Sequence, residues 1–143
     1  LLGWASAYTN FQPEKKRGAS RLDGFFSAPG LPDLWVECKN VSLVEDGVAA
    51  FPDAVSLRGL KHLGELVEIA ALGQRACMLY VVQRPDAACF APADYIDPLY
   101  AEGLAKAYAA GVEIKVLEIG IQPEGVYFTG TLPLARTFLS ALP

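Results

Sequence analysis

Residues 20–41 of the chain read SRLDGFFSAPGLPDLWVECKNV. Two runs of strand-like composition, 20–27 and 34–43, enclose the turn 28–33, which holds two prolines and one glycine. Proline lacks the amide hydrogen that a β-ladder needs, and both residue types favour turns. The chain is therefore predicted to reverse at 28–33 and to pair the two runs as neighbouring antiparallel strands.

Beyond this pair, strand-like and helical runs alternate, with turn residues at the joints. A glycine-containing turn at 45–47 predicts a third antiparallel strand over 47–51. The uninterrupted apolar run within 75–83 is typical of a strand covered on both faces, and we expect it to be the central strand. Closing strands are predicted at 113–121 and 125–130, and 131–143 receives no assignment.

Two helices are indicated by capping residues and by the spacing of apolar side chains. The first is predicted over 52–72, with Asp53 capping its first turn and Gly73 ending it. The second is predicted over 97–111, because Asp97 is followed by a proline at the first helical position. Strands and helices that alternate along one chain indicate a mixed α/β fold.

The composition is that of a single globular domain, residues 1–143, with 52% hydrophobic and 20% charged residues. No apolar run approaches the ~20 residues of a membrane-spanning helix, so no membrane partner is expected. The chain opens at Leu1 rather than at methionine, which indicates that a preceding part is missing. The three cysteines have no CxxC spacing, which argues against a disulfide framework or a zinc site and favours a reducing, cytoplasmic compartment.

Several function classes are excluded by what the sequence lacks. It contains no GxxxxGK, GxGxxG or GxSxG pattern and only one histidine. Nucleotide hydrolysis by a P-loop and hydrolysis by a serine nucleophile are therefore excluded. The net charge of −4 provides no general attraction for nucleic acid, so any such contact has to come from a local basic cluster.

One cluster of polar residues has the chemistry of a metal site. Glu37 and Lys39 are two apart in the second strand and project from the same face, and Asp23 falls beside Glu37 if the first two strands pair. Mg²⁺ or Mn²⁺ would suit Asp23, Glu37, the Cys38 carbonyl oxygen and water, because both ions accept oxygen ligands. Activation of a water by the ion, with Lys39 stabilising negative charge, predicts phosphodiester hydrolysis. The alternative is a set of ordinary polar positions on half-solvated strands, since an ExK triplet is common by chance.

The densest basic cluster lies immediately before Asp23 and consists of Lys15, Lys16, Arg17 and Arg21. We predict that these side chains bind the phosphate backbone of DNA. Recognition of a particular base sequence is not indicated. The alternative is a solvated loop without a binding role.

A second basic group, Arg58, Lys61 and His62, lies in the first predicted helix at positions i, i+3 and i+4. This spacing places the three side chains on one face, opposite the apolar stripe, and we expect that face to be free. They are candidates for contact with DNA near the scissile phosphate. A lone histidine, however, is more often a hydrogen-bonded structural residue.

Eight short segments, taken in order, resemble the sugar fermentation stimulation protein family. The similarity covers nearly all of residues 1–134. The segments are 20–23, 36–41, 51–55, 58–63, 81–86, 90–93, 96–98 and 110–113.

The resemblance implies a restriction-endonuclease-like PD-(D/E)xK core, with a mixed central sheet flanked by helices. The Asp and ExK positions of the family match Asp23, Glu37 and Lys39 here. The resemblance also implies an N-terminal OB-like domain, which would lie upstream of residue 1 and is absent from this sequence. Relatives carry a glutamate near Glu14, which makes Glu14 a weaker candidate for a metal ligand, with a solvated surface position as the alternative.

The leading functional hypothesis is a Mg²⁺- or Mn²⁺-dependent nuclease that binds DNA without strong sequence specificity. The alternative is a non-catalytic DNA-binding regulator of sugar metabolism genes, as the family name implies. A domain that binds a metabolite is a third possibility. An oligomer is compatible with all three.

Overall fold

The computed structural model describes residues 3–142 of the chain. Its strands are β1 (Asn10–Arg17), β2 (Ser20–Ser27), β3 (Leu34–Val41), β4 (Leu43–Glu45), β5 (Val48–Phe51), β6 (Arg75–Val82), β7 (Cys89–Pro92), β8 (Glu113–Gln122) and β9 (Gly125–Thr131). Its helices are the 3-10 turn η1 (Gly3–Ala5) and the α-helices α1 (Leu57–Ala71), α2 (Pro98–Ala109) and α3 (Arg136–Ser140). Within the described range, no helix is both long and apolar enough to cross a membrane.

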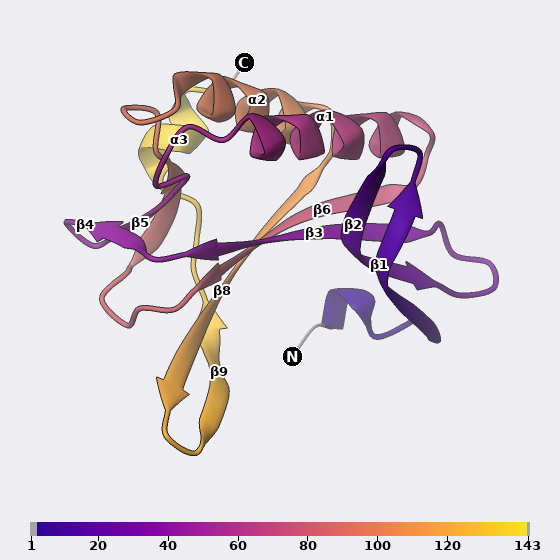
Figure 1. The fold of residues 1–143 in the computed structure, drawn as a ribbon, viewed down its shortest axis with the longest axis horizontal. Helices are drawn as coiled ribbons and strands as arrows, with labels where there is room; N and C mark the ends of the chain where they lie inside the picture. The colour runs from indigo at the N-terminus through magenta and orange to yellow at the C-terminus, as the bar shows by residue number, and fades with distance from the viewer. Residues whose placement is uncertain (1–2, 143) are drawn as a thin grey trace.

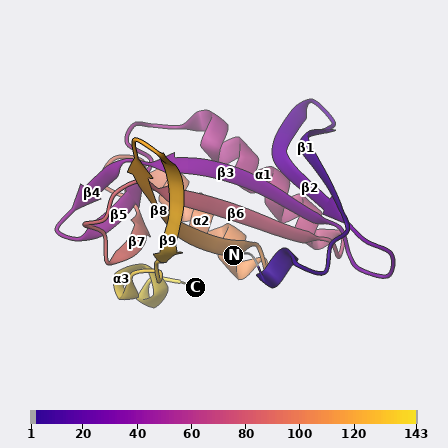
Figure 2. The ribbon, with the colours of Figure 1, turned by 90° about the horizontal axis from the view of Figure 1, so that it is seen from below.

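Six strands form the main sheet, in the order β1-β2-β3-β6-β8-β9 (Figure 1). β3, β6 and β8 are parallel, whereas β1, β2 and β9 pair antiparallel with their neighbours, so the sheet is mixed. The parallel neighbours require crossover connections, which α1 and α2 supply on one face of the sheet (Figures 1 and 2). β6 lies in the interior of the sheet, which confirms the prediction of a central strand.

The main core lies between this sheet and the two long helices. Leu63, Leu66 and Ile69 recur at helical spacing in α1 and are buried, so this stripe of the helix faces the sheet. A smaller apolar cluster occupies the opposite face of the sheet, where Trp4 and Tyr8 pack against residues of β3 and β6. The sheet is therefore covered on both faces near its centre, which accounts for the continuous apolar run of β6.

The predicted third antiparallel strand does not join the main sheet, and in this respect the prediction is wrong. β5 pairs with β4 and with β7 in a separate three-stranded sheet. The hairpin between β4 and β5 turns at Asp46 and Gly47, whose φ angles of 48° and 78° suit a tight turn of opposite hand to the common type. The four-residue strand β7 was not predicted, because so short a run carries no detectable periodicity.

The start of α2 was predicted correctly, and the start of α1 was not. Asp97 caps α2 as predicted, since its carboxylate accepts a hydrogen bond of 2.9 Å from the Tyr100 amide. α1 begins later than predicted, and its cap is Ser56, whose hydroxyl accepts from the Gly59 amide at 3.0 Å. Asp53 is exposed and precedes the helix. Ser56 and Asp53 are both good capping residues, so the choice between them is decided by tertiary contacts.

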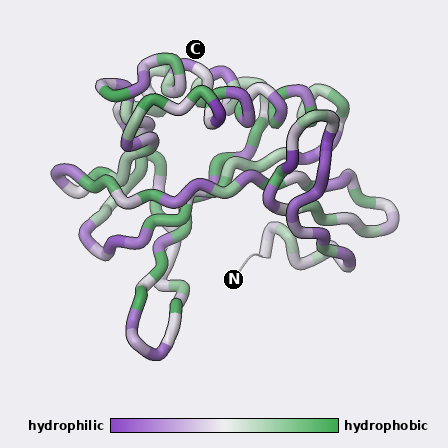
Figure 3. The backbone as a smooth tube through the Cα atoms, in the orientation of Figure 1, coloured by the Kyte–Doolittle hydropathy of each residue, from purple (hydrophilic) through white to green (hydrophobic). Residues whose placement is uncertain are grey.

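Residues 10–17 form the edge strand β1, a segment for which no strand was predicted. The strand is largely exposed and polar, so it lacks the alternation of apolar residues that identifies a half-buried strand. It also contains Pro13, which an edge strand tolerates. Figure 3 shows this hairpin of β1 and β2 as predominantly hydrophilic.

Asp97 holds the first turns of both long helices. One carboxylate oxygen caps α2, and the other accepts a hydrogen bond of 2.8 Å from the Ser56 amide ahead of α1. We expect Asp97→Ala to lower the free energy of unfolding by about 2–4 kcal/mol, because a cap is lost and a partly buried amide loses its acceptor. Urea denaturation followed by circular dichroism measures the change.

The matched control is Ser56→Ala, which removes the cap of α1 alone and is expected to cost about 1 kcal/mol. If the two variants were equally stable, the bridging role of Asp97 would be refuted.

Candidate active site

The site begins at a break in the pairing of β2 with β3. Leu22 and Phe25 both pack into the main core although they are three residues apart, so the alternation of faces is interrupted between them. Opposite this point on β1, Glu14 has a positive φ of 50°, and the recorded β1–β2 pairs pass from Pro13–Gly24 to Lys15–Leu22. The register is the same on both sides of this gap, so the interruption is a local distortion of both strands rather than a β-bulge, and it changes the direction of the side chain at its centre.

The re-aimed side chain is that of Asp23. The ladder between β2 and β3 runs from Phe26–Leu34 to Gly24–Val36, and beyond it the Asp23 carboxylate accepts a hydrogen bond of 2.8 Å from the Cys38 amide. Asp23 thus lies next to the ExK segment of β3, as the sequence analysis predicted.

Glu37 and Lys39 project from β3 toward α1. Glu37 is only 3% exposed, and its Oε1 atom is 2.7 Å from Lys39 Nζ. His62 of α1 completes the cluster: its Nδ1 atom contacts Glu37 Oε1 and is 3.3 Å from Lys39 Nζ. The expectation that His62 lies on a free helix face is therefore wrong, because it is 4% exposed and packs over β3.

The other carboxylate oxygen of Glu37 is unsatisfied. Oε2 is buried and has no hydrogen-bond partner among residues 3–142. A buried carboxylate oxygen without a partner is costly, and a hard cation is the kind of ligand that removes the cost. Across the same residues, no three His, Cys, Asp or Glu side chains are close enough to form a preformed metal cage. Mg²⁺ does not require such a cage, since it is usually held by one or two carboxylates together with waters.

The carboxylates of Asp23 and Glu37 both affect the pKa of the Cys38 thiol. Desolvation of its sulfur, followed by the negative charges of Asp23 and Glu37, raises the pKa of Cys38 to about 11, while Lys39 acts in the opposite direction. The negative potentials of Asp23 and Glu37 therefore overlap at Cys38.

A buried pair of tyrosines lies near this cluster and was not identified from the sequence. The hydroxyls of Tyr80 and Tyr100 are 2.6 Å apart, and both side chains are fully buried. Burial raises the pKa of Tyr100, and the charge of Glu37 adds to the effect. The only sequence signal was a tyrosine within the otherwise aliphatic run of β6.

A basic groove opens between the tip of the β1–β2 hairpin and the first half of α1, and we call it the hairpin groove. It has a volume of about 570 Å³, and one end reaches His62. Its lining residues are Lys16, Gly18, Ala19, Ser20, Arg21, Arg58, Lys61 and His62.

The structure brings five of the seven predicted DNA contacts into the hairpin groove and separates two from it. Lys15 lies over the ring of Phe25 at 4.9 Å, and Arg17 pairs with Glu68 of α1 at 3.3 Å. The weaker ligand candidate Glu14 is exposed and pairs with Arg21 at 3.4 Å. The Glu14 side chain thus contacts the basic cluster rather than Asp23 or Glu37.

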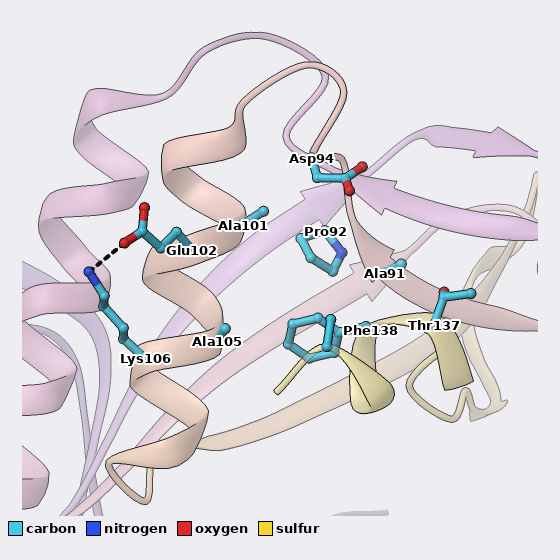
Figure 4. A pocket seen from close by; sticks show the side chains of 10 residues that line it. Ala91, Pro92, Asp94, Ala101, Glu102, Ala105, Lys106, Thr137 and Phe138 are labelled. Atoms are coloured by element: carbon cyan, nitrogen blue, oxygen red, sulfur yellow. Dashed lines mark ion pairs between the residues drawn. The ribbon is translucent and has the colours of Figure 1, made fainter. Parts of the chain in front are cut away.

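A second cavity, of about 480 Å³, lies between β7, α2 and α3. Figure 4 shows Ala101 and Ala105 of α2 facing Phe138 across it. Its one basic lining residue, Lys106, is paired with Glu102 at 2.7 Å. The cavity is therefore mainly apolar and differs in chemistry from the hairpin groove.

Comparison with known proteins identifies the family. Residues 2–125 match the family model described as the sugar fermentation stimulation protein RE domain. The chain belongs to the sugar fermentation stimulation protein family. This confirms the resemblance drawn from the eight sequence segments.

Several relatives carry the family name. A sugar fermentation stimulation protein homolog of Maridesulfovibrio salexigens is 51% identical over 92% of this chain and 56% of its own length. A homolog of Syntrophobacter fumaroxidans is 54% identical over 83% of this chain and 45% of its own length. The chain thus spans about half the length of the curated relatives that it matches.

A solved structure of the family has the same fold. The structure of Pyrococcus furiosus SfsA in complex with Ca²⁺ superposes with a TM-score of 0.86 at 32% identity and covers 94% of this chain and 58% of that one. The mixed α/β architecture with a mixed sheet is therefore shared with SfsA.

The pKa of Cys38 provides a test of the local charge distribution. We expect Asp23→Asn to accelerate alkylation of Cys38 by iodoacetamide at pH 8 about two- to threefold. Removal of one negative charge lowers the thiol pKa and increases the thiolate fraction, and a partial loss of nucleophilicity offsets this gain. Peptide mass spectrometry at timed intervals measures the rate.

Cys89 serves as the internal control, because it lies on β7 and its labelling rate should not change. An unchanged or slower reaction at Cys38 would contradict the charge distribution described above.

Proposed function

We propose that the chain is a divalent-metal-dependent nuclease with a PD-(D/E)xK core, in which Asp23 and Glu37 hold the metal and Lys39 assists the chemistry. The observation that carries the proposal is the buried, unpartnered Oε2 atom of Glu37. Glu37 lies on the strand segment that Asp23 contacts through the Cys38 amide, and its neighbour His62 lines a basic groove. A cation and an anionic substrate are the two ligands that such a place attracts.

Two comparisons support the proposal. The matching family model is described as an RE domain, in agreement with the restriction-endonuclease-like core that the resemblance implies. SfsA of Pyrococcus furiosus was solved in complex with Ca²⁺. Ca²⁺, Mg²⁺ and Mn²⁺ all accept carboxylate and carbonyl oxygens, so a Ca²⁺ complex in a relative is consistent with an oxygen-ligand site here.

The residues present fit Mg²⁺ or Mn²⁺. Asp23 and Glu37 would provide carboxylate oxygens, and the carbonyl oxygen of Cys38, the residue after Glu37, would be a further ligand. When bound, the ion would lower the pKa of a coordinated water and stabilise the charge of the phosphate. Glu14 is a poor fit, because its side chain pairs with Arg21 on the surface.

Lys39 and His62 hold Glu37 ready for this role. Both contact Glu37 Oε1, which leaves Oε2 as the oxygen that is free to bind a cation. The ammonium group of Lys39 also lies where it can donate a hydrogen bond to an attacking water or to a phosphate oxygen that gains charge. His62 acts here as a positioning residue, and it links Glu37 to the hairpin groove.

A second function, DNA binding without cleavage, is favoured by one observation. Glu37 Oε1 already has two cationic or hydrogen-bonding neighbours, and this arrangement is stable without a metal. A regulator would use the basic groove alone and retain the carboxylates for folding. The two proposals differ in their dependence on Glu37, because cleavage requires its charge and binding does not.

The nuclease proposal predicts that the rate of DNA cleavage depends on three side chains. We expect the wild-type chain to cut fluorescent DNA substrates in Mn²⁺ or Mg²⁺, and Asp23→Asn, Glu37→Gln and Lys39→Ala each to lower the rate by about 100-fold or more. Substrates should include single strands, duplexes and branched DNA, resolved on denaturing gels.

The matched control is Glu124→Gln, which removes an exposed carboxylate in the turn between β8 and β9 and should leave the rate unchanged. Equal inactivity of the wild-type chain and Asp23→Asn on every substrate, with DNA binding intact, would reject the nuclease in favour of the regulator.

Metal binding can be measured separately from cleavage. We expect Mn²⁺ to raise the melting temperature of the wild-type chain, because a ligand at 100 times its Kd adds about 2.7 kcal/mol to the stability of the folded state. Glu37→Gln should abolish the increase, and Glu124→Gln should retain it. If Mn²⁺ raised the melting temperature of all three proteins equally, the ion would bind at a site that does not include Glu37.

A further inference from the structure

We propose that the hairpin groove receives one unpaired DNA strand, so that the substrate class is single-stranded DNA or the unpaired end of a duplex rather than an intact double helix. The inference rests on the proposed function, because it names the substrate of the same site. Its support comes from how the groove is closed, how large it is and how its charges are arranged.

The groove is closed at one end by contacts between the hairpin tip and α1. The Ser20 hydroxyl donates a hydrogen bond to the Glu65 carboxylate, and Arg17 pairs with Glu68 at 3.3 Å. Both acidic residues lie C-terminal to Lys61 on α1, beyond the lining of the groove. Figure 1 shows the hairpin tip beside the helix. A rigid double helix cannot pass through a channel that is bridged in this way, whereas a flexible strand can enter from the open end.

The volume of the groove leads to the same conclusion. At about 570 Å³ it is within the range of about 300–1,000 Å³ that accommodates a ligand of drug size. That space suits a ligand of nucleotide size rather than a double helix. A duplex would rest on the outside, where the hairpin tip and α1 separate its phosphates from Glu37.

The charges in the groove suit a sugar-phosphate backbone. Lys16 and Arg58 are exposed and have no ion-pair partner among residues 3–142. Among residues 3–142, Arg21 and Lys61 form only long ion pairs, of 3.4 Å to the exposed Glu14 and of 3.8 Å to Glu65, so both cations can also contact a phosphate. Four cations therefore line a space that one strand can fill.

The lining of the groove contains no Phe, Tyr or Trp, and its one ring, that of His62, is buried against Glu37 and Lys39. Proteins that hold single strands by their bases use exposed aromatic rings as stacking platforms. The lining of the hairpin groove is basic, small or polar instead. Contact is thus made to phosphates, and the strand is selected by its flexibility rather than by its bases.

His62 connects the groove with the reactive cluster. It lines the groove and also contacts Glu37 and Lys39. A phosphate that passes along Lys16 and Arg58 therefore approaches Glu37 from the side of His62. The DNA strand in the groove would therefore lead directly to the cluster of Glu37 and Lys39.

The test compares DNA forms in the absence of divalent metal, so that binding is measured without cleavage. Fluorescence anisotropy is recorded with an oligothymidylate of about 20 nucleotides and with a blunt, G·C-ended duplex of the same length. We expect the strand to bind at least about tenfold more tightly than the duplex at equal salt. Equal affinity, or tighter binding of the duplex, would overturn the inference.

Substitutions in the groove locate the binding. In Lys16→Ala/Arg58→Ala we expect about tenfold weaker binding of the strand and a loss of about 1.4 from the slope of log affinity against log salt, since each phosphate contact contributes about 0.7. The matched control is Arg84→Ala/Lys106→Ala, which removes the same charge outside the groove. Equal losses in the two double variants would overturn the inference, because binding would then follow net charge alone.

The failure of this inference can be told from the failure of the proposed function. If Glu37→Gln and the wild-type chain bind the strand equally but neither cleaves DNA, the nuclease fails and the strand groove remains. If the wild-type chain cleaves intact duplex faster than a single strand, the nuclease remains and the strand groove fails.

Discussion

The hydrogen bond between the Asp23 carboxylate and the Cys38 amide is the contact on which the site depends. Where β2 leaves β3, the ladder no longer supplies an acceptor for that amide. The side chain of Asp23 therefore stands in for a backbone carbonyl. β2 and β3 are held together next to Glu37, so the carboxylate proposed to bind the metal also has a structural role.

The electrostatics of Glu37 follow from this geometry. Its charge is buried against α1, and it persists there because Lys39 and His62 both contact one of its oxygens. The second oxygen has no such neighbour among the described residues. One oxygen of Glu37 is thus paired within the protein and the other is left for the cation of the proposed nuclease.

The sequence predicted the features that are encoded locally. β6 was recognisable from its apolar run, α2 from Asp97, and the proximity of Asp23 to the ExK segment from the proline-rich turn between two strands. Prediction from the sequence failed where the structure depends on contacts with residues that are distant in sequence. Periodicity assigns His62 to a helix face but cannot tell that this face crosses β3, and nothing local distinguishes Ser56 from Asp53 as the cap, because the choice depends on contacts with Asp97. The strands β1 and β7 were missed, and β5 was predicted as a strand but placed in the wrong sheet, because polarity, shortness and pairing with distant strands leave little local signal.

The two hydrogen bonds of Asp97 have a consequence for motion. Because a single carboxylate anchors the chain at the start of both α1 and α2, the opening turns of the two helices are expected to fray as one cooperative unit, with amide protons that exchange together. His62 is carried by one of these helices and Tyr100 by the other. We therefore expect thermal fluctuations at the two walls around Glu37 to be correlated.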